Sequence, residues 1–129
     1  LAENLGVDIL FETMVSDEEL IKAYNKASLT VFPSLLEPLG LVPLESMSCG
    51  TPVIGIAEAG VRETICHNST GILTARDPIK FGEAIENLLK DDELRLNMGK
   101  NARQYIIQKW TWDHSFKTLE QNIQRVVGG

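Results

Sequence analysis

Ser34–Ser48 reads SLLEPLGLVPLESMS and is followed at once by CGTPVI, which ends at Ile54. Glu37 and Glu45 are separated by seven residues, and the Gly-Leu-Val-Pro segment between them is typical of the start of a helix. Gly50 stands where a left-handed C-terminal cap is usual. We therefore predict a short helix that ends just before this glycine.

Strands are predicted on both sides of this helix. Leu29–Phe32 is a β-branched and apolar run that ends at a Pro-Ser turn, which is typical of a buried strand in a parallel sheet. Pro52 prevents the helix from continuing, and Val53–Ala57 reads as the next strand. The order strand, loop, helix, strand predicts a parallel α/β fold.

The beginning of the predicted helix offers free hydrogen-bond donors. The amides of Gly40, Leu41 and Val42 have no carbonyl four residues back, so a phosphate placed there gains hydrogen bonds and the favourable helix dipole. Glu45 lies about 7 Å along the axis from Gly40 at about 1.5 Å per residue, and Glu37 lies in the loop before the helix. Along the chain, a carboxylate acceptor is followed by amide donors and then by a second carboxylate acceptor. This order suits a ligand with hydroxyls at both ends and negative charge in the middle.

The rest of the chain alternates strands and helices, with no internal repeat. Ser16 and Glu19 predict a capping box at the start of a helix. A second helix is predicted to open at Asp77-Pro78. We predict strands at 7–15, 29–32, 53–57 and 71–74, and further helices at 61–66 and 113–126.

Three helical segments are predicted to carry an apolar stripe that faces the core. The first stripe is made of Leu20, Ile21, Tyr24 and Ala27. The second is made of Phe81, Ala84, Ile85 and Leu88, and the third of Leu94, Met98, Ala102, Tyr105 and Ile106.

Several motifs together resemble one known family. Val31–Ser34, Glu37–Ile54 and Ala59–Glu63 look like the donor-binding half of retaining glycosyltransferases of the two-domain GT-B type, the group that includes glycogen synthase and many mannosyltransferases. Val15–Tyr24 resembles the helix before the motif, and the two tryptophans of Trp110–Trp112 resemble the signal before the last helix of the family. The similarity covers nearly the whole chain.

The resemblance implies a role for each matched residue. Glu37 would bind hydroxyls of the transferred sugar and is the catalytic candidate, while Glu45 would bind the ribose of the nucleotide. The amides of Gly40, Leu41 and Val42 would meet the diphosphate and sugar, with Pro38 beside them in the same loop. The loop that carries Thr13 and Met14 usually helps to hold the nucleobase in this family. The implied ligand is a nucleotide-diphosphate sugar, and no metal or other cofactor is expected.

The chain departs from the family pattern at three positions. Ala59 precedes Gly60 where Gly-Gly is common, Arg62 replaces a frequent Pro, and Thr13 replaces a frequent Gly. The last change leaves the identity of the nucleobase open.

The 129 residues are expected to form a single donor-binding domain, a fragment of a two-domain enzyme that lacks the acceptor-binding N-terminal domain. The predicted fold is a Rossmann-like parallel sheet of about four strands with helices on both faces, without the first two strand-helix units. The basic pair that neutralises the diphosphate in the family is not found, so the chain alone should bind nucleotide weakly and transfer no sugar. The edge of the Leu29–Phe32 strand would then be open. We expect self-association through that edge, or its repair by Val7–Val15.

Composition excludes several other classes of protein. The net charge of −6 argues against a nucleic-acid footprint or a basic membrane patch, and no apolar stretch is long enough to span a membrane. Cys49 and Cys66 are too few for a disulfide framework or a zinc site. A cytoplasmic location is expected, and a peripheral membrane position of the full-length enzyme stays open.

Two alternatives to a hexosyltransferase domain remain from the sequence. One is a nucleotide-sugar epimerase of the same architecture, and the other is a non-catalytic nucleotide-sugar-binding or interaction module. The sugar, the base, the acceptor and the oligomeric state are not determined by these residues.

Overall fold

The fold is built on a parallel sheet of three strands in the order β1-β2-β3, as seen in a computed structural model that describes residues 2–128. The strands are β1 (Thr30–Phe32), β2 (Val53–Ile56) and β3 (Gly71–Thr74), with Val31 paired to Ile54 and Ile54 to Ile72. The described residues also form a short 3₁₀ helix, η1 (Glu3–Leu5), and the helices α1 (Asp17–Lys26), α2 (Leu41–Ser48), α3 (Val61–Thr64), α4 (Pro78–Lys90), α5 (Asp92–Lys109) and α6 (Trp112–Val127).

Helices cover both faces of the sheet, as predicted. Val53 packs on one face with Met47 of α2, Val61 of α3 and Ala102 and Ile106 of α5. Because successive strand residues point to opposite faces, its neighbour Ile54 packs on the other face, in a cluster that contains Leu88 of α4 and Met98 of α5. The predicted stripe of α4 is therefore core. The stripe of α5 is core except for Leu94, which is exposed.

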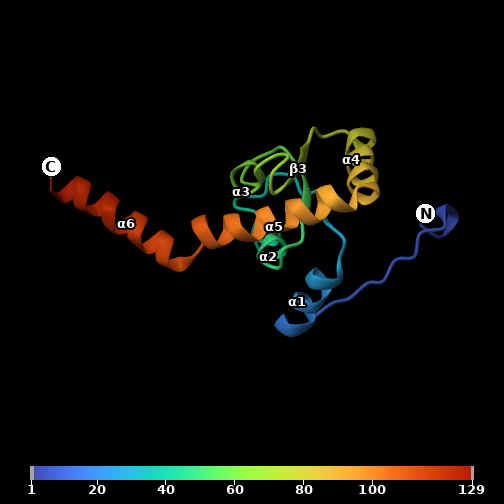
Figure 1. Ribbon diagram of the computed structural model, residues 1–129, viewed down its shortest axis with the longest axis horizontal. Coiled ribbons are helices and arrows are strands. Elements are labelled where there is room, and N and C mark those ends of the chain that lie inside the picture. Colours follow the sequence, from blue (N-terminus) through green and yellow to red (C-terminus); the bar gives the residue numbers. More distant parts are fainter. Residues whose placement is uncertain (1, 129) are drawn as a thin grey trace.

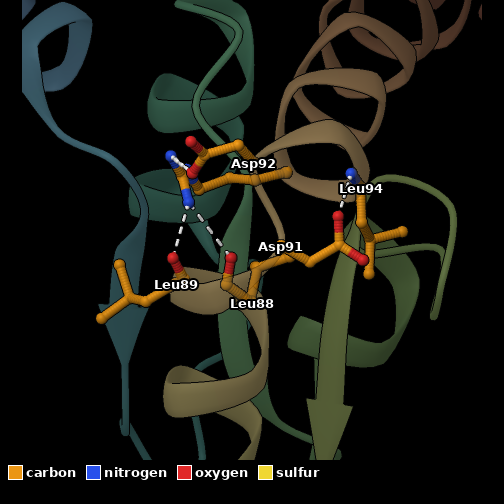
Figure 2. A network of polar contacts seen from close by, with 6 residues as sticks. Leu88, Leu89, Asp91, Asp92 and Leu94 are labelled. Carbon is orange, nitrogen blue, oxygen red and sulfur yellow. Dashed lines mark hydrogen bonds and ion pairs between the residues drawn. The ribbon is translucent and has the colours of Figure 1, made fainter.

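A sharp corner joins α4 to α5 (Figure 2). Asp91 caps α5 by accepting a hydrogen bond from the N–H of Leu94 at 2.9 Å. The guanidinium of Arg95 donates to the carbonyls of Leu88 and Leu89 at the end of α4, at 3.2 and 3.1 Å. These bonds satisfy backbone groups that a helix end leaves without partners, so the two helices meet at a defined angle.

The helix α1 begins as predicted but does not pack as predicted. Ser16 Oγ accepts from the N–H of Glu19, and Glu19 Oε2 accepts from the N–H of Ser16, which completes the capping box. The inward-facing stripe is wrong: α1 has no buried residue, and Ile21 is 52% exposed. An amphipathic helix buries its stripe only where another apolar surface lies opposite, and the strand predicted just before α1 is absent.

The predicted strand at 7–15 is wrong. The segment is extended but pairs with no strand among residues 2–128, and Leu10 and Phe11 are 82% and 86% exposed. In Figure 1 it runs from α1 toward the N-terminus, away from the sheet. A strand requires a neighbour for its N–H and C=O groups, and apolar patterning does not supply one. The sheet has three strands instead of four, and the expected repair of the β1 edge by Val7–Val15 does not occur.

The open edge of β1 leads to a prediction about assembly. Within the described residues β1 pairs with β2 alone, and Val31 at its centre is 46% exposed. An unpaired edge without charge or proline is a template for another chain. We expect the wild-type chain to self-associate in light scattering at micromolar concentration, and Val31→Lys to weaken this by placing a charge on the edge.

The matched control is Ile79→Lys, which adds the same charge at an exposed position of α4. It should leave self-association unchanged. A wild-type chain that is monomeric over the whole concentration range would show that the edge is not a pairing site.

The last helix lies apart from the sheet. It occupies Trp112–Val127, close to the predicted 113–126, and none of its residues is buried. Figure 1 shows α6 extending away from the sheet beyond the end of α5. Across residues 2–128, no helix combines the length and the apolar composition needed to cross a membrane.

Candidate functional site

The loop that leaves β1 carries Glu37 and is held by hydrogen bonds at two points. Glu37 is half-buried, and its Oε1 accepts from the N–H of Gly40 at 3.1 Å. Its backbone carbonyl accepts from the N–H of Gly60 at 2.9 Å, just before α3. Because the carboxyl ends of parallel strands share one edge of the sheet, this loop and the segment after β2 meet there. The first carboxylate is therefore fixed by contacts made from both segments.

Gly40 is the residue at which the loop turns into α2. It is buried and left-handed, with φ of +82°, and a Cβ built there would lie 3.1 Å from Thr64 Oγ1. Only glycine adopts this conformation readily. The glycine thus allows a close approach of α2 to α3.

The first turn of α2 has two free donors. The N–H groups of Leu41 and Val42 have no acceptor within the described residues. Pro43 has no N–H, and the N–H of Leu44 donates to the carbonyl of Gly40 at 3.3 Å. The N–H of Gly40 is already donated to Glu37. An anion at this helix end would therefore meet the amides of Leu41 and Val42 and the positive end of the helix dipole. No side chain caps this end of the helix.

The second carboxylate, Glu45, lies one turn further along α2 on an exposed position. Its Oε2 accepts a hydrogen bond of 3.1 Å from the hydroxyl of Tyr24, which belongs to α1. Burial, together with the charge and hydrogen bond of Glu45, raises the pKa of Tyr24 to about 12. The phenol is therefore protonated at neutral pH and acts as the donor. Along the chain, Glu37 precedes the free amides of Leu41 and Val42, and Glu45 follows them.

Thr13 and Met14 lie in the exposed segment before α1. Met14 has a left-handed backbone, with φ of 56°. No hydrogen bond within residues 2–128 connects either of them to α2 or to the loop of Glu37. The structure thus brings together Glu37, Pro38, Gly40, Leu41, Val42 and Glu45, which are close in sequence, and shows no such link for the predicted base-binding pair.

Two residues of the site are not identified by sequence reasoning. Tyr24 is predicted as part of an apolar stripe, and its hydrogen bond to Glu45 joins α1 to α2. Gly60 has the stronger sequence signal, because a glycine directly before a helix indicates close approach of backbones. A Cβ at Gly60 would lie 2.3 Å from the carbonyl oxygen of Pro38.

No metal centre is found in the part of the chain that the structure describes, since no three His, Cys, Asp or Glu side chains lie close enough together to hold an ion. Cys49 and Cys66 are both free thiols.

Comparison with known proteins gives the following matches. Residues 1–105 match the family described as Glycosyl transferases group 1. The chain is 34% identical over 124 residues to D-inositol 3-phosphate glycosyltransferase of Corynebacterium jeikeium. The aligned region covers 94% of this chain and 29% of that protein.

Solved structures also resemble this chain over most of its length. Sucrose-phosphate synthase of Thermosynechococcus elongatus is 32% identical with a TM-score of 0.85, over 97% of this chain and 32% of that one. HepE of Anabaena, in complex with UDP and glucose, is 25% identical with a TM-score of 0.67, over 86% of this chain and 29% of that one. The chain thus spans about a third of the length of these relatives.

Proposed function

Because this chain belongs to the glycosyl transferases group 1 family, we propose that it binds the nucleotide-diphosphate sugar used by a glycosyltransferase. The observation that carries the proposal is the pair of free amides of Leu41 and Val42, flanked by the carboxylates of Glu37 and Glu45. The complex of HepE with UDP and glucose supports a uridine nucleotide as the first ligand to test. Family membership favours this function over the epimerase alternative.

The proposed pose follows the order of donors and acceptors along the site. The diphosphate lies at the start of α2, where its charge is stabilised by the amides and the helix dipole. Glu45 accepts hydrogen bonds from the ribose hydroxyls. Glu37 accepts from hydroxyls of the sugar, and its bond to the Gly40 N–H orients the carboxylate toward them.

The proposed reaction is transfer of a hexosyl group to an alcohol with retention at the anomeric carbon. The bond between the anomeric carbon and the diphosphate oxygen breaks, and a bond to the acceptor oxygen forms. The proton of the acceptor passes to the departing phosphate or to a base supplied from outside this chain. The share of this chain is electrostatic, because the α2 amides stabilise the charge that develops on the leaving diphosphate, while Glu37 as catalytic residue holds the reacting sugar in place.

Two variants test these roles by titration calorimetry with UDP and UDP-glucose. Glu45→Ala removes the ribose acceptor, so we expect about tenfold weaker binding of both ligands, the effect of losing a hydrogen bond to a charged group. Glu37→Ala removes the sugar acceptor, so it should weaken UDP-glucose about tenfold and leave UDP nearly unchanged.

Glu83→Ala is the matched control, since this glutamate is exposed on α4, which covers the face of the sheet opposite to α2. It should bind both ligands as the wild type does. Equal effects of Glu37→Ala and Glu45→Ala on bare UDP would contradict the assigned roles, and a wild-type chain that binds neither ligand would contradict the proposed function.

A further inference from the structure

Tyr24 connects α1 to α2 by one hydrogen bond and to the segment before β2 by another. Its hydroxyl donates to Glu45 Oε2 at 3.1 Å, and its backbone carbonyl accepts from Thr51 Oγ1 at 2.7 Å. Thr51 is buried two residues before β2, so its hydrogen bond anchors the end of α1 to the core. The backbone of Tyr24 is therefore tied to the segment that leads into β2.

Among residues 2–128, the carboxylate of Glu45 has no other hydrogen bond to orient it. It is exposed on α2 and borders a hollow of about 840 Å³, together with Leu20, Ile21 and Tyr24 of α1 and Arg103 of α5. The guanidinium of Arg103 donates to the carbonyl of Ser48. An exposed glutamate side chain samples many rotamers, and fixing one of them on ligand binding costs conformational entropy. The phenol restricts this freedom before any ligand arrives.

The geometry leaves the rest of the carboxylate available. Each carboxylate oxygen accepts more than one hydrogen bond, and Tyr24 occupies one acceptor position on Oε2. The oxygen Oε1 has no donor within the described residues. A vicinal diol, which offers two adjacent hydroxyl donors, can then bond to Oε1 and to the second acceptor position of Oε2.

We propose that Tyr24 is a positioning residue for nucleotide recognition, which holds the carboxylate of Glu45 ready to accept both hydroxyls of a ribose. This inference rests on the proposed function in that Glu45 is taken to bind the ribose. Tyr24 does not touch the ligand and acts through Glu45. Preorganisation of this kind raises affinity by lowering the entropy lost on binding.

The first test is calorimetry on the full chain with UDP and with its 2′,3′-dideoxy analogue. Tyr24→Phe keeps the ring and removes the donor, so we expect UDP to bind about three- to tenfold more weakly. Binding of the dideoxy analogue should not change, because it has no ribose hydroxyls for Glu45 to accept. In a Glu45→Ala background, Tyr24→Phe should have no further effect on UDP.

Tyr105→Phe is the matched control, since it removes a phenol from α5 that packs against the core cluster of Met47 and Val53. It should bind UDP like the wild type. Equal weakening of UDP and of the dideoxy analogue by Tyr24→Phe would assign Tyr24 a purely structural role and overturn the inference, as would unchanged binding of UDP.

The second test needs no ligand and so separates this inference from the proposed function. NMR relaxation of the Glu45 side-chain methylenes measures how far the carboxylate is held in one orientation. The order parameter should fall in Tyr24→Phe and stay at the wild-type value in Tyr105→Phe. An unchanged order parameter would overturn the inference, whether or not the chain binds UDP.

Discussion

Gly99→Ala should destabilise the protein by about 2 kcal/mol and lower its melting temperature by roughly 5–10 °C. Gly99 is buried in α5, where a Cβ would lie 2.2 Å from the carbonyl oxygen of Gly50. That oxygen belongs to backbone between the end of α2 and β2, so it cannot rotate away as a side chain would. The added methyl must separate α5 from α2, and this opens the core cluster that contains Met47 and Ala102.

Gly82→Ala is the control for this change. Gly82 lies on an exposed position of α4, and a Cβ there meets no atom within 4 Å. Alanine favours the helix over glycine, so we expect stabilisation of about 0.5–1 kcal/mol. Thermal and urea unfolding followed by circular dichroism measures both variants. A Gly99→Ala variant as stable as Gly82→Ala would show that the contact between α5 and the end of α2 is not tight.

Gly60→Ala should reduce binding of UDP-glucose by about tenfold or more, an effect of the size of one lost hydrogen bond to a charged group. A Cβ at Gly60 would lie 2.3 Å from the oxygen and 2.6 Å from the carbon of the Pro38 carbonyl. The methyl must push this loop away from α3, and Glu37 moves with it. The N–H of Gly60 would also lose its hydrogen bond to the Glu37 carbonyl, which is 2.9 Å long.

Measuring the affinity for bare UDP as well shows whether the loss comes from displacement of the loop that carries Glu37. Glu45 is not part of the displaced loop, so UDP should lose less affinity than UDP-glucose. Ala59→Gly is the matched control at the adjacent residue: Ala59 has φ of 44°, a left-handed conformation that glycine adopts without strain. This variant should bind both ligands as the wild type does. Equal binding of UDP-glucose by Gly60→Ala and the wild type would contradict the proposed dependence of Glu37 on this contact.

Much of the local structure is predictable from the sequence because it depends on residues that are neighbours along the chain. The capping box of Ser16 and Glu19, the left-handed Gly50 after α2, with φ of 78°, and the start of α4 at Pro78 all appear where predicted. The loop and the helix that carry the candidate site are local in the same way. Glu37, Gly40 and Glu45 are held by one loop and one helix, so their order along the chain already decides their order in space.

Predictions that depend on distant partners are the ones that fail. Val7–Val15 has the apolar pattern of a strand but pairs with no strand in the described residues, and the inward-facing stripe of α1 meets no sheet face. The hydrophobic pattern of a segment shows which of its side chains can be buried. It does not show whether another surface lies opposite to bury them.

By itself, the sequence determined the family, the parallel α/β character and the flanking of the α2 start by two glutamates, since each depends on short-range order along the chain. Only the tertiary structure decided that Tyr24 meets Glu45, that Gly60 leaves no room for a Cβ beside the Pro38 carbonyl and that the sheet has three strands. Tyr24 and Glu45 are 21 residues apart. Contacts of this kind follow from how helices and strands pack in three dimensions, where residues distant in the chain become neighbours.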